Sequence, residues 1–227
     1  MTNAETIEAA RTADTLRILL VDDHDLFRTG LRNLLEEQGV KVVGEAGTGA
    51  EAIRGVREHA PDVVVMDLNM PGMTGVEATR HISSVSPLTR VLVLTISDQD
   101  GDVMDAIMAG ACGYLLKDAS IQELLRGIEA AAVGESLISP HIAAKVLQRL
   151  RAASSEPDLE ATIRAELSDR EIQVLKLIAN GNDNAQIAGE LHISPKTVKN
   201  HISNILMKLQ IENRIQAAVY AVRSGLV

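Results

Sequence analysis

The chain has 227 residues, which is long for a single mixed domain and sufficient for two. Aromatic residues make up only 1% of it, too few for a stacking platform that binds single-stranded nucleic acid. The single cysteine, Cys112, excludes an internal disulfide and a multi-thiolate zinc site, and we expect it to be a small buried residue. No apolar run approaches the roughly 18 residues of a membrane span, and residues 1–15 lack the apolar core of a signal peptide. We therefore expect a cytoplasmic protein with no membrane partner.

The net charge of −9 is unevenly distributed. Residues 1–140 carry 11 Lys and Arg against 22 Asp and Glu, whereas residues 141–227 carry 11 against 9. Within the second part, residues 191–210 include three lysines and no acidic residue. The acidic first part argues against nucleic acid binding there, whereas the basic stretch permits it near the C-terminus.

After a polar leader at 1–15, short apolar runs alternate with helical patterns as far as residue 133. The apolar runs span 17–22, 41–46, 63–68, 90–95 and 112–116. This strict alternation predicts an α/β domain, a five-stranded doubly wound parallel sheet with helices on both faces, flavodoxin-like in type. Gly39, Gly110 and Gly134 stand where the ends of helices are expected.

The strand pattern disappears from about residue 141, and four helical patterns follow a connecting helix (141–150) and a flexible linker (152–157). Ser168 with Glu171 predicts a capping box, and Ser194-Pro195 predicts another helix start. The second domain is therefore expected to be an all-α four-helix unit. The expected divisions are a mobile leader (1–15), the α/β domain (16–135), the connecting helix and linker (136–163) and the helical domain (164–227).

Acidic residues follow two of the predicted strands, with Asp22 and Asp23 after the first and Asp67 at the end of the third. In a sheet of order 2-1-3-4-5 these strands are neighbours, and their carboxyl ends form the crevice where open α/β sheets bind ligands. Three anions in one crevice repel each other unless a cation lies among them, and carboxylates are ligands suited to Mg²⁺. The sequence therefore predicts a Mg²⁺ site at this edge.

A hydroxyl and an ammonium are expected at the same edge, from Thr95 at the end of the fourth strand and Lys117 after the fifth. This set is suited to phosphoryl transfer, with Asp67 as the nucleophile and the other two carboxylates holding the Mg²⁺. Lys117 can pair with one phosphoryl oxygen and Thr95 can donate to another. Each group alone has a plainer interpretation, as a turn former, a solvated lysine or a core residue. The presence of all five groups at one edge of the sheet favours a phosphoryl-transfer site.

Together with Met70-Pro71-Gly72, these five positions resemble the receiver domain of bacterial two-component response regulators, over residues 17–133. The resemblance implies that a sensor histidine kinase phosphorylates Asp67, and that the backbone carbonyl of Asn69 completes the Mg²⁺ shell. It also implies that Tyr114 swings inward with Thr95 to report phosphorylation. From its residue type alone, Tyr114 is more often a packing residue with a solvated hydroxyl.

The predicted helices at 184–191 and 195–209 are joined by a tight turn, as in a helix-turn-helix. The polar face of the second helix offers groups suited to base edges and phosphates. The residues expected to bind DNA are Lys196, Thr197, Lys199, Asn200, Ser203, Asn204 and Lys208. Met207 is expected to be a packing residue. The plainer alternatives are a solvated helix face or a surface that binds another protein.

Residues 167–226 resemble the LuxR-type DNA-binding domain, notably in Leu167-Ser168-Asp169-Arg170-Glu171 and Thr197-Val198-Lys199-Asn200-His201. With the receiver in front, the whole chain resembles a NarL/FixJ-family response regulator. The resemblance implies base contacts at Lys199, Asn200 and Ser203. We expect phosphorylation to shift a pre-existing equilibrium of the receiver, to free the C-terminal domain and to favour homodimers on promoter DNA, with the last helix (213–224) as a candidate dimer face.

Three alternative interpretations are less favoured by the sequence. A hydrolase of the haloacid dehalogenase type needs a second acid two residues after its nucleophile, and Asn69 stands there. We therefore expect that the protein is not an enzyme. A regulator with a vestigial receiver, working without phosphorylation, is disfavoured by the five intact groups. A ligand-gated LuxR regulator is disfavoured because residues 17–133 have the acidic pattern of a receiver.

Overall fold

The computed structural model describes residues 16–138, 142, 146, 163 and 165–227. The expected leader (1–15) and flexible linker (152–157) lie outside these residues, as does the expected connecting helix at 141–150 apart from two positions. Among the described helices, none is both long enough and apolar enough to cross a membrane.

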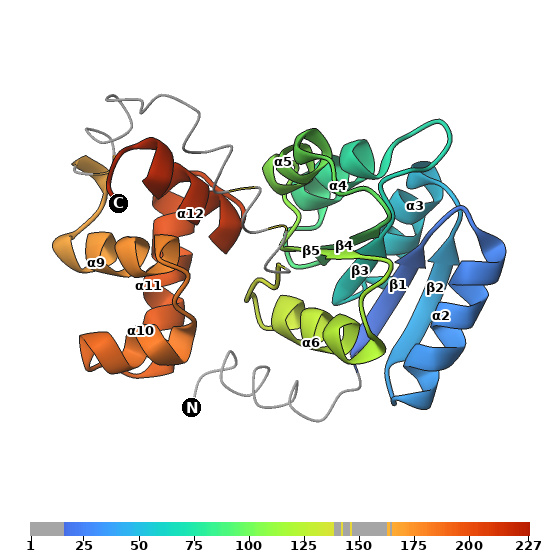
Figure 1. The fold of residues 1–227 in the computed structure, drawn as a ribbon, viewed down its shortest axis with the longest axis horizontal. Coiled ribbons are helices and arrows are strands. Elements are labelled where there is room, and N and C mark those ends of the chain that lie inside the picture. The colour runs from blue at the N-terminus through green and yellow to red at the C-terminus, as the bar shows by residue number, and fades with distance from the viewer. Residues whose placement is uncertain (1–15, 139–141, 143–145, 147–162, 164) are drawn as a thin grey trace.

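The first domain is built on a five-stranded parallel sheet in the order β2-β1-β3-β4-β5, which confirms the predicted topology (Figure 1). The strands are β1 (Arg17–Val21), β2 (Lys41–Ala46), β3 (Val63–Met66), β4 (Arg90–Thr95) and β5 (Gly113–Leu116). Because β1 lies between β2 and β3, the chain reverses its direction of winding there. The residues that follow β1 and β3 are therefore brought together at one edge.

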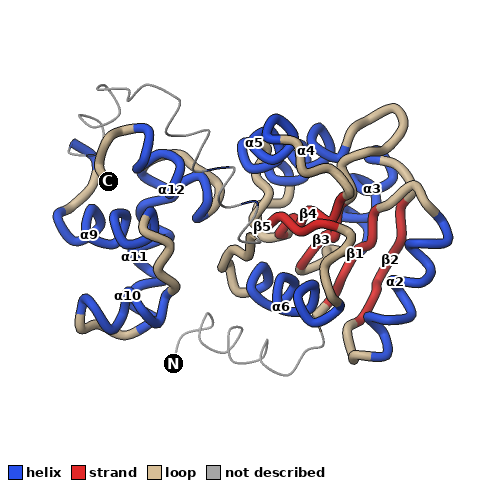
Figure 2. Tube along the Cα trace, in the orientation of Figure 1, coloured by secondary structure: helices blue, strands red, loops and turns tan. Residues whose placement is uncertain are grey.

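Five helices cover the two faces of this sheet (Figures 1 and 2). They are α2 (Asp25–Glu37), α3 (Gly49–His59), α4 (Gly75–Val85), α5 (Asp100–Met108) and α6 (Ile121–Ala132). Ile18 and Leu20 of β1 pack in the core under α2 and α6, whereas Leu19 and Val21 pack in the core under α3 and α4. This alternation is the period of two that a strand imposes on its side chains.

Glycine is required at helix ends of the first domain and where two backbone segments approach each other closely. The predicted helix ends at Gly39 and Gly110 have φ of 81° and 107°, in the region that favours glycine. At the start of α4, a Cβ on Gly75 would lie 2.0 Å from the carbonyl oxygen of Asp67. The first turn of α4 can therefore pack directly behind Asp67 only because residue 75 has no side chain.

The second domain consists of α9 (Asp169–Ala179), α10 (Asn184–Leu191), α11 (Pro195–Lys208) and α12 (Arg214–Arg223). Its core joins side chains of all four helices, among them Val174, Ile187, Val198 and Ala217. The predicted capping box is confirmed, since Ser168 accepts a hydrogen bond from the backbone of Glu171 and Glu171 accepts one from Ser168. The predicted start of α11 is confirmed as well, with Ser194 as its cap.

The two domains are in contact through α12 and α5. Ile215 and Val219 of α12 share a buried cluster with Val103 and Ile107 of α5. The side-chain amide of Gln216, which is also buried, donates a hydrogen bond of 2.9 Å to the carbonyl oxygen of Ile107. This carbonyl lies in the last turn of α5, where it also accepts a hydrogen bond of 3.0 Å from the backbone N–H of Gly110. The Gln216 side chain thus adds a polar contact to the apolar one between the two domains.

Glu171 also joins α9 to α11, because Lys208 donates to its carboxylate over 2.8 Å. Burial works to raise the pKa of Glu171, but hydrogen bonds from Lys208 and Ser168 outweigh it and hold that pKa below its ordinary value. A carboxyl group whose pKa is lowered by folding stabilises the fold above its unfolded pKa. That stabilisation is lost as the pH falls through the folded pKa.

We predict that Glu171→Gln lowers the free energy of unfolding by about 2 kcal/mol near neutral pH. The difference from the wild type should begin to shrink below a pH of about 4.3, the ordinary pKa of a glutamate. It should disappear as the pH falls through the lower pKa of the folded protein, where the wild-type carboxylate is protonated too. Urea unfolding of the whole chain, followed by circular dichroism across this range, measures it. Glu166→Gln, at an exposed position nearby, is the control and should change stability by less than about 0.5 kcal/mol. An equal loss at every pH would contradict the role given to the carboxylate.

Candidate functional site

The carboxylates of Asp22 and Asp67 lie side by side at the carboxyl edge of the sheet, as predicted. Lys117 joins them, with its Nζ atom 2.6 Å from Oδ2 of Asp22 and 2.8 Å from Oδ2 of Asp67. Both carboxylates are almost fully buried, at 4% and 2% exposure of the residue. Because buried like charges repel strongly, the ammonium supplies a counter-charge that stabilises these two carboxylates at one edge.

Lys117 is itself held in its charged form. Burial works to lower the pKa of Lys117, but its hydrogen bonds and ion pairs with Asp22 and Asp67 outweigh burial and raise it. Its Nζ atom also lies 4.7 Å from the centre of the Phe27 ring, within the range of a cation–π contact. The side chain therefore carries a fixed positive charge to the point where β1 and β3 end.

Asp23, the third predicted carboxylate, completes an acidic cluster that fits a divalent cation. Ligand atoms of Asp22, Asp23, His24 and Asp67 all lie within 4.8 Å of one another. The Oδ1 atom of Asp23 is buried, and the Nδ1 atom of His24 lies 2.8 Å from it. A buried carboxylate oxygen is costly unless a donor or a cation satisfies it. The three carboxylates offer hard oxygen donors, which suit Mg²⁺.

His24 was not singled out from the sequence, and it lies at the rim of this cluster. Its Nδ1 atom is 2.8 Å from Oδ1 of Asp23 and 3.4 Å from Oδ1 of Asp22, and the imidazole side chain is 70% exposed. Its backbone N–H donates to Asp22 over 2.9 Å. The only signal in the sequence is its place directly after the two acids, which does not tell a ligand from a helix cap.

Thr95 lies at the end of β4, as predicted, and is fully buried. Its hydroxyl oxygen accepts a long hydrogen bond of 3.4 Å from the backbone N–H of Ser97. The backbone N–H of Asn69 lies 3.4 Å from Oδ1 of Asp67. The predicted roles of the Thr95 hydroxyl and the Asn69 carbonyl stay predictions.

Tyr114 is turned into the domain and is fully buried. Its hydroxyl is not solvated, because it donates a hydrogen bond of 2.9 Å to the carbonyl oxygen of Ser97, two residues beyond Thr95. Burial, together with the nearby charges of Asp102 and Asp98, raises the pKa of Tyr114 above its ordinary value. The ring belongs to the same cluster as α12 of the second domain, through Ile215 and its neighbours. One side chain thus links the Thr95 loop to the domain contact.

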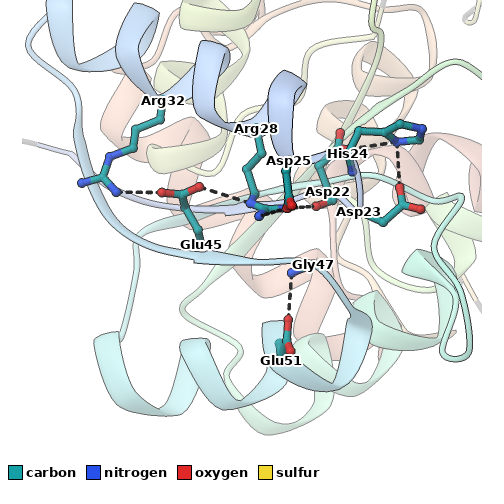
Figure 3. Close-up of polar contacts among 9 residues, drawn as sticks. All are labelled: Asp22, Asp23, His24, Asp25, Arg28, Arg32, Glu45, Gly47 and Glu51. Carbon is teal, nitrogen blue, oxygen red and sulfur yellow. Dashed lines mark hydrogen bonds and ion pairs between the residues drawn. The ribbon is translucent and has the colours of Figure 1, made fainter.

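Arg28 is a second residue near the site whose role the sequence does not reveal. It lies one turn into α2 and donates to the backbone carbonyl of Asp22, while it also pairs with Asp25 and Glu45 (Figure 3). The side chain is only 14% exposed. A lone arginine on a helix carries no signal in the sequence, since its acceptors come from a loop and from a separate strand.

In the second domain, α11 turns its apolar side inward, with Val198 and Ile205 fully buried. Its opposite side is open to solvent. The exposed residues of the predicted DNA-binding set are Lys196, Lys199, Asn200, Ser203 and Asn204. Met207 is 69% exposed, so the expectation that it packs in the core was wrong. At helical spacing, residue 207 falls in line with 196, 200 and 203, and this is the solvent side.

Two other members of the predicted set have partners inside the domain. The hydroxyl of Thr197 lies 2.8 Å from that of the cap residue Ser194. The ammonium of Lys208 is bound to Glu171 on α9, as described above. Their predicted contacts with DNA stay predictions, and Lys208 has a structural role in any case.

Comparison with known families agrees with this division of the chain. Residues 18–129 match the family described as "Response regulator receiver domain". Residues 165–221 match the family described as "Bacterial regulatory proteins, luxR family". The acidic cluster lies in the first match and the exposed face of α11 in the second.

Similar proteins cover nearly the whole chain. "Transcriptional regulatory protein LiaR" of Bacillus subtilis is 45% identical over 213 residues, which are 93% of this chain and 99% of that protein. "Response regulator protein VraR" of Staphylococcus aureus is 39% identical over 214 residues, with 94% and 99% covered.

Two solved structures cover both domains as well. That of the response regulator ChrA of a heme-sensing two-component system is similar with a TM-score of 0.52 and 34% identity, over 94% of this chain and 99% of the other. A structure of RcsB dimers bound to DNA gives a TM-score of 0.53 and 26% identity, over 93% and 99%. The chain therefore belongs to the transcriptional response regulators of two-component systems, in the group that joins a receiver domain to a LuxR-type DNA-binding domain.

Proposed function

We propose that Asp67 accepts a phosphoryl group from the phosphohistidine of a sensor histidine kinase. The observation that carries this is the buried carboxylate of Asp67 beside Asp22 with the Lys117 ammonium 2.8 Å away. An oxygen of Asp67 attacks the phosphorus, the new P–O bond forms as the P–N bond breaks, and the released imidazole takes up a proton. Lys117 then pairs with a phosphoryl oxygen, and the Thr95 hydroxyl donates to another.

Asp22, Asp23 and Asp67 would hold a Mg²⁺ ion in this site, with the backbone carbonyl of Asn69 as a further ligand. The gathering of ligand atoms from these three carboxylates within 4.8 Å of one another supports this assignment. When bound, the ion supplies positive charge that stabilises the phosphoryl oxygens during transfer. The protein's own contribution is to hold three carboxylates and one ammonium at fixed positions before the phosphodonor arrives.

The output of this step is a change in the contact between the domains. Tyr114 connects the loop after Thr95 to the second domain. Its hydroxyl donates to the carbonyl of Ser97 in this loop, and its ring packs in the cluster with α12. A hydroxyl drawn towards a phosphoryl group at Asp67 would disturb this loop and the cluster below it. The receiver then shifts between two pre-existing states, of which one releases α12.

DNA binding is assigned to the exposed face of α11, which would enter the major groove of a promoter. Its lysines and asparagines have the donors that read base edges, and no acidic residue occurs from 191 to 210. A released α12 is free to pair with a second copy, and such a dimer reads two half-sites about one helical turn apart. The similarity to RcsB, whose dimers were solved on DNA, supports this arrangement.

Phosphorylation is tested by measuring the intact mass of the protein after incubation with acetyl phosphate and Mg²⁺. We expect one added phosphoryl group in the wild type, none in Asp67→Ala, and none when a chelator removes the Mg²⁺. Asp105→Asn, at an exposed position on α5, is the control and should be phosphorylated like the wild type. If the wild type gains nothing from either acetyl phosphate or a panel of histidine kinases, the receiver does not work by phosphorylation.

For the DNA-binding face, we predict that Lys199→Ala weakens binding to a duplex selected in vitro by the phosphorylated protein. The loss should be about 1–3 kcal/mol, the value of one base contact. Lys176→Ala, at an exposed position on α9, is the control and should bind within about twofold of the wild type. Fluorescence anisotropy measures both affinities. Equal losses of DNA affinity in both variants would contradict the assignment of DNA binding to α11.

The contact between the domains gives a further prediction. Gln216→Ala removes the hydrogen bond to Ile107, worth about 1 kcal/mol, and should shift the balance towards separated domains about fivefold. Amide hydrogen exchange in α12 and the radius of gyration should both rise in the unphosphorylated protein. Gln122→Ala, at an exposed position on α6, should leave both unchanged. Unaltered exchange in Gln216→Ala would show that this bond does not hold the domains together.

A further inference from the structure

The backbone of the loop that carries Asp22 and Asp23 accepts a hydrogen bond from the side chain of Arg28 (Figure 3). The guanidinium donates through Nη1 to the backbone carbonyl oxygen of Asp22. Through Nη2 it lies 2.5 Å from Oδ1 of Asp25, and through Nε it lies 3.1 Å from Oε2 of Glu45. One planar group thus ties the β1–α2 loop, the first turn of α2 and strand β2 to each other.

Glu45 is in turn fixed by a second arginine. Arg32, one turn further along α2, lies 2.7 Å from Oε1 of Glu45 (Figure 3). It also pairs with Glu36. The two oxygens of Glu45 are therefore divided between two arginines, of which Arg28 touches the loop. Within the part of the chain that the structure describes, Arg32 makes no hydrogen bond to the loop. The pair offers a natural comparison between an arginine that reaches the loop and one that does not.

The contact with Asp22 is to its carbonyl, which belongs to the peptide that joins Asp22 to Asp23. The orientation of this peptide sets the relative directions of the two side chains. Because Arg28 binds the carbonyl, it leaves the carboxylate oxygens of both residues available to a cation and to Lys117. An arginine in this position acts on the site through the backbone.

We propose that Arg28 is a positioning residue of the cation site, which it serves by fixing the Asp22–Asp23 peptide. This inference rests on the proposed role of the acidic cluster in Mg²⁺ binding. Groups that orient the ligands of a metal commonly change its affinity by about 10- to 100-fold when they are removed. Arg28 was not expected from the sequence, and its charge would otherwise argue against any part in holding a cation.

The direction of the change in cation affinity distinguishes a positioning role of Arg28 from a simple effect of its charge. Removing Arg28 takes a positive charge away and leaves Asp25 and Glu45 with one counterion fewer. Both changes make the surroundings more negative and, by Coulomb's law, should strengthen the binding of a cation. Positioning predicts the opposite result, because a loop that has lost its anchor presents the two carboxylates in many arrangements. Weaker binding in the variant therefore reports geometry.

The experiment compares Arg28→Gln with Arg32→Gln in the full-length chain. Mn²⁺ serves as the probe, with free ion measured by electron paramagnetic resonance and Mg²⁺ as the competitor. We expect the dissociation constant to rise about tenfold in Arg28→Gln and less than about twofold in Arg32→Gln. The rate of phosphorylation by acetyl phosphate should fall at low Mg²⁺ and recover at saturating Mg²⁺. A merely structural arginine would lower the unfolding temperature without this recovery.

Arg28→Lys covers the case in which the glutamine variant does not fold. Lysine keeps the charge but cannot bridge three acceptors, so its dissociation constant should also rise, by a smaller factor. The proposal is overturned if both Arg28 variants bind Mn²⁺ as tightly as the wild type or more tightly, or if Arg32→Gln weakens binding equally. A wild-type chain that binds neither ion would instead count against the proposed function of the acidic cluster.

Discussion

The mutual repulsion of buried carboxylates is the constraint on which the first domain is organised. Asp22 and Asp67 lie within reach of one ammonium because β1 and β3 are neighbours and end at the same level. Without Lys117 from the end of β5, two buried negative charges would face each other across the crevice. The sheet order, the position of Lys117 and the acidic cluster therefore depend on each other. A change in any one of them would leave a buried charge without a counterion.

The same cluster shows how far sequence reasoning can go. The strand order and the meeting of Asp22, Asp67, Thr95 and Lys117 at one edge were predictable, because strands of period two fix where their last residues lie. Helix ends at Gly39 and Gly110 and the caps at Ser168 and Ser194 were predictable for a similar reason. Each depends on a local rule of the backbone that the residue type reveals.

What could not be predicted depends on side chains that meet across elements. Arg28 binds the loop before it and a strand that follows it, and neither contact has a spacing that a sequence displays. The helical spacing places Met207 on the polar side of α11, and its exposure shows that an apolar residue type alone does not indicate packing. The predicted polar face of α11 included Lys208, whose partner lies on another helix. Long side chains at the border of a helical face can turn either way, and only packing decides.

The contact between the two domains limits the ways in which the receiver can control the DNA-binding domain. In the closed arrangement Lys199 and Asn200 of α11 remain exposed, while Ile215 and Val219 of α12 are buried against α5. The groups suited to base edges are therefore open to solvent, and the helix suited to pairing is covered. Control by masking the base contacts would require the reverse. The geometry instead favours the proposed mechanism, in which phosphorylation acts on α12. DNA affinity then rises because two DNA-binding domains bind as a pair and their contacts add.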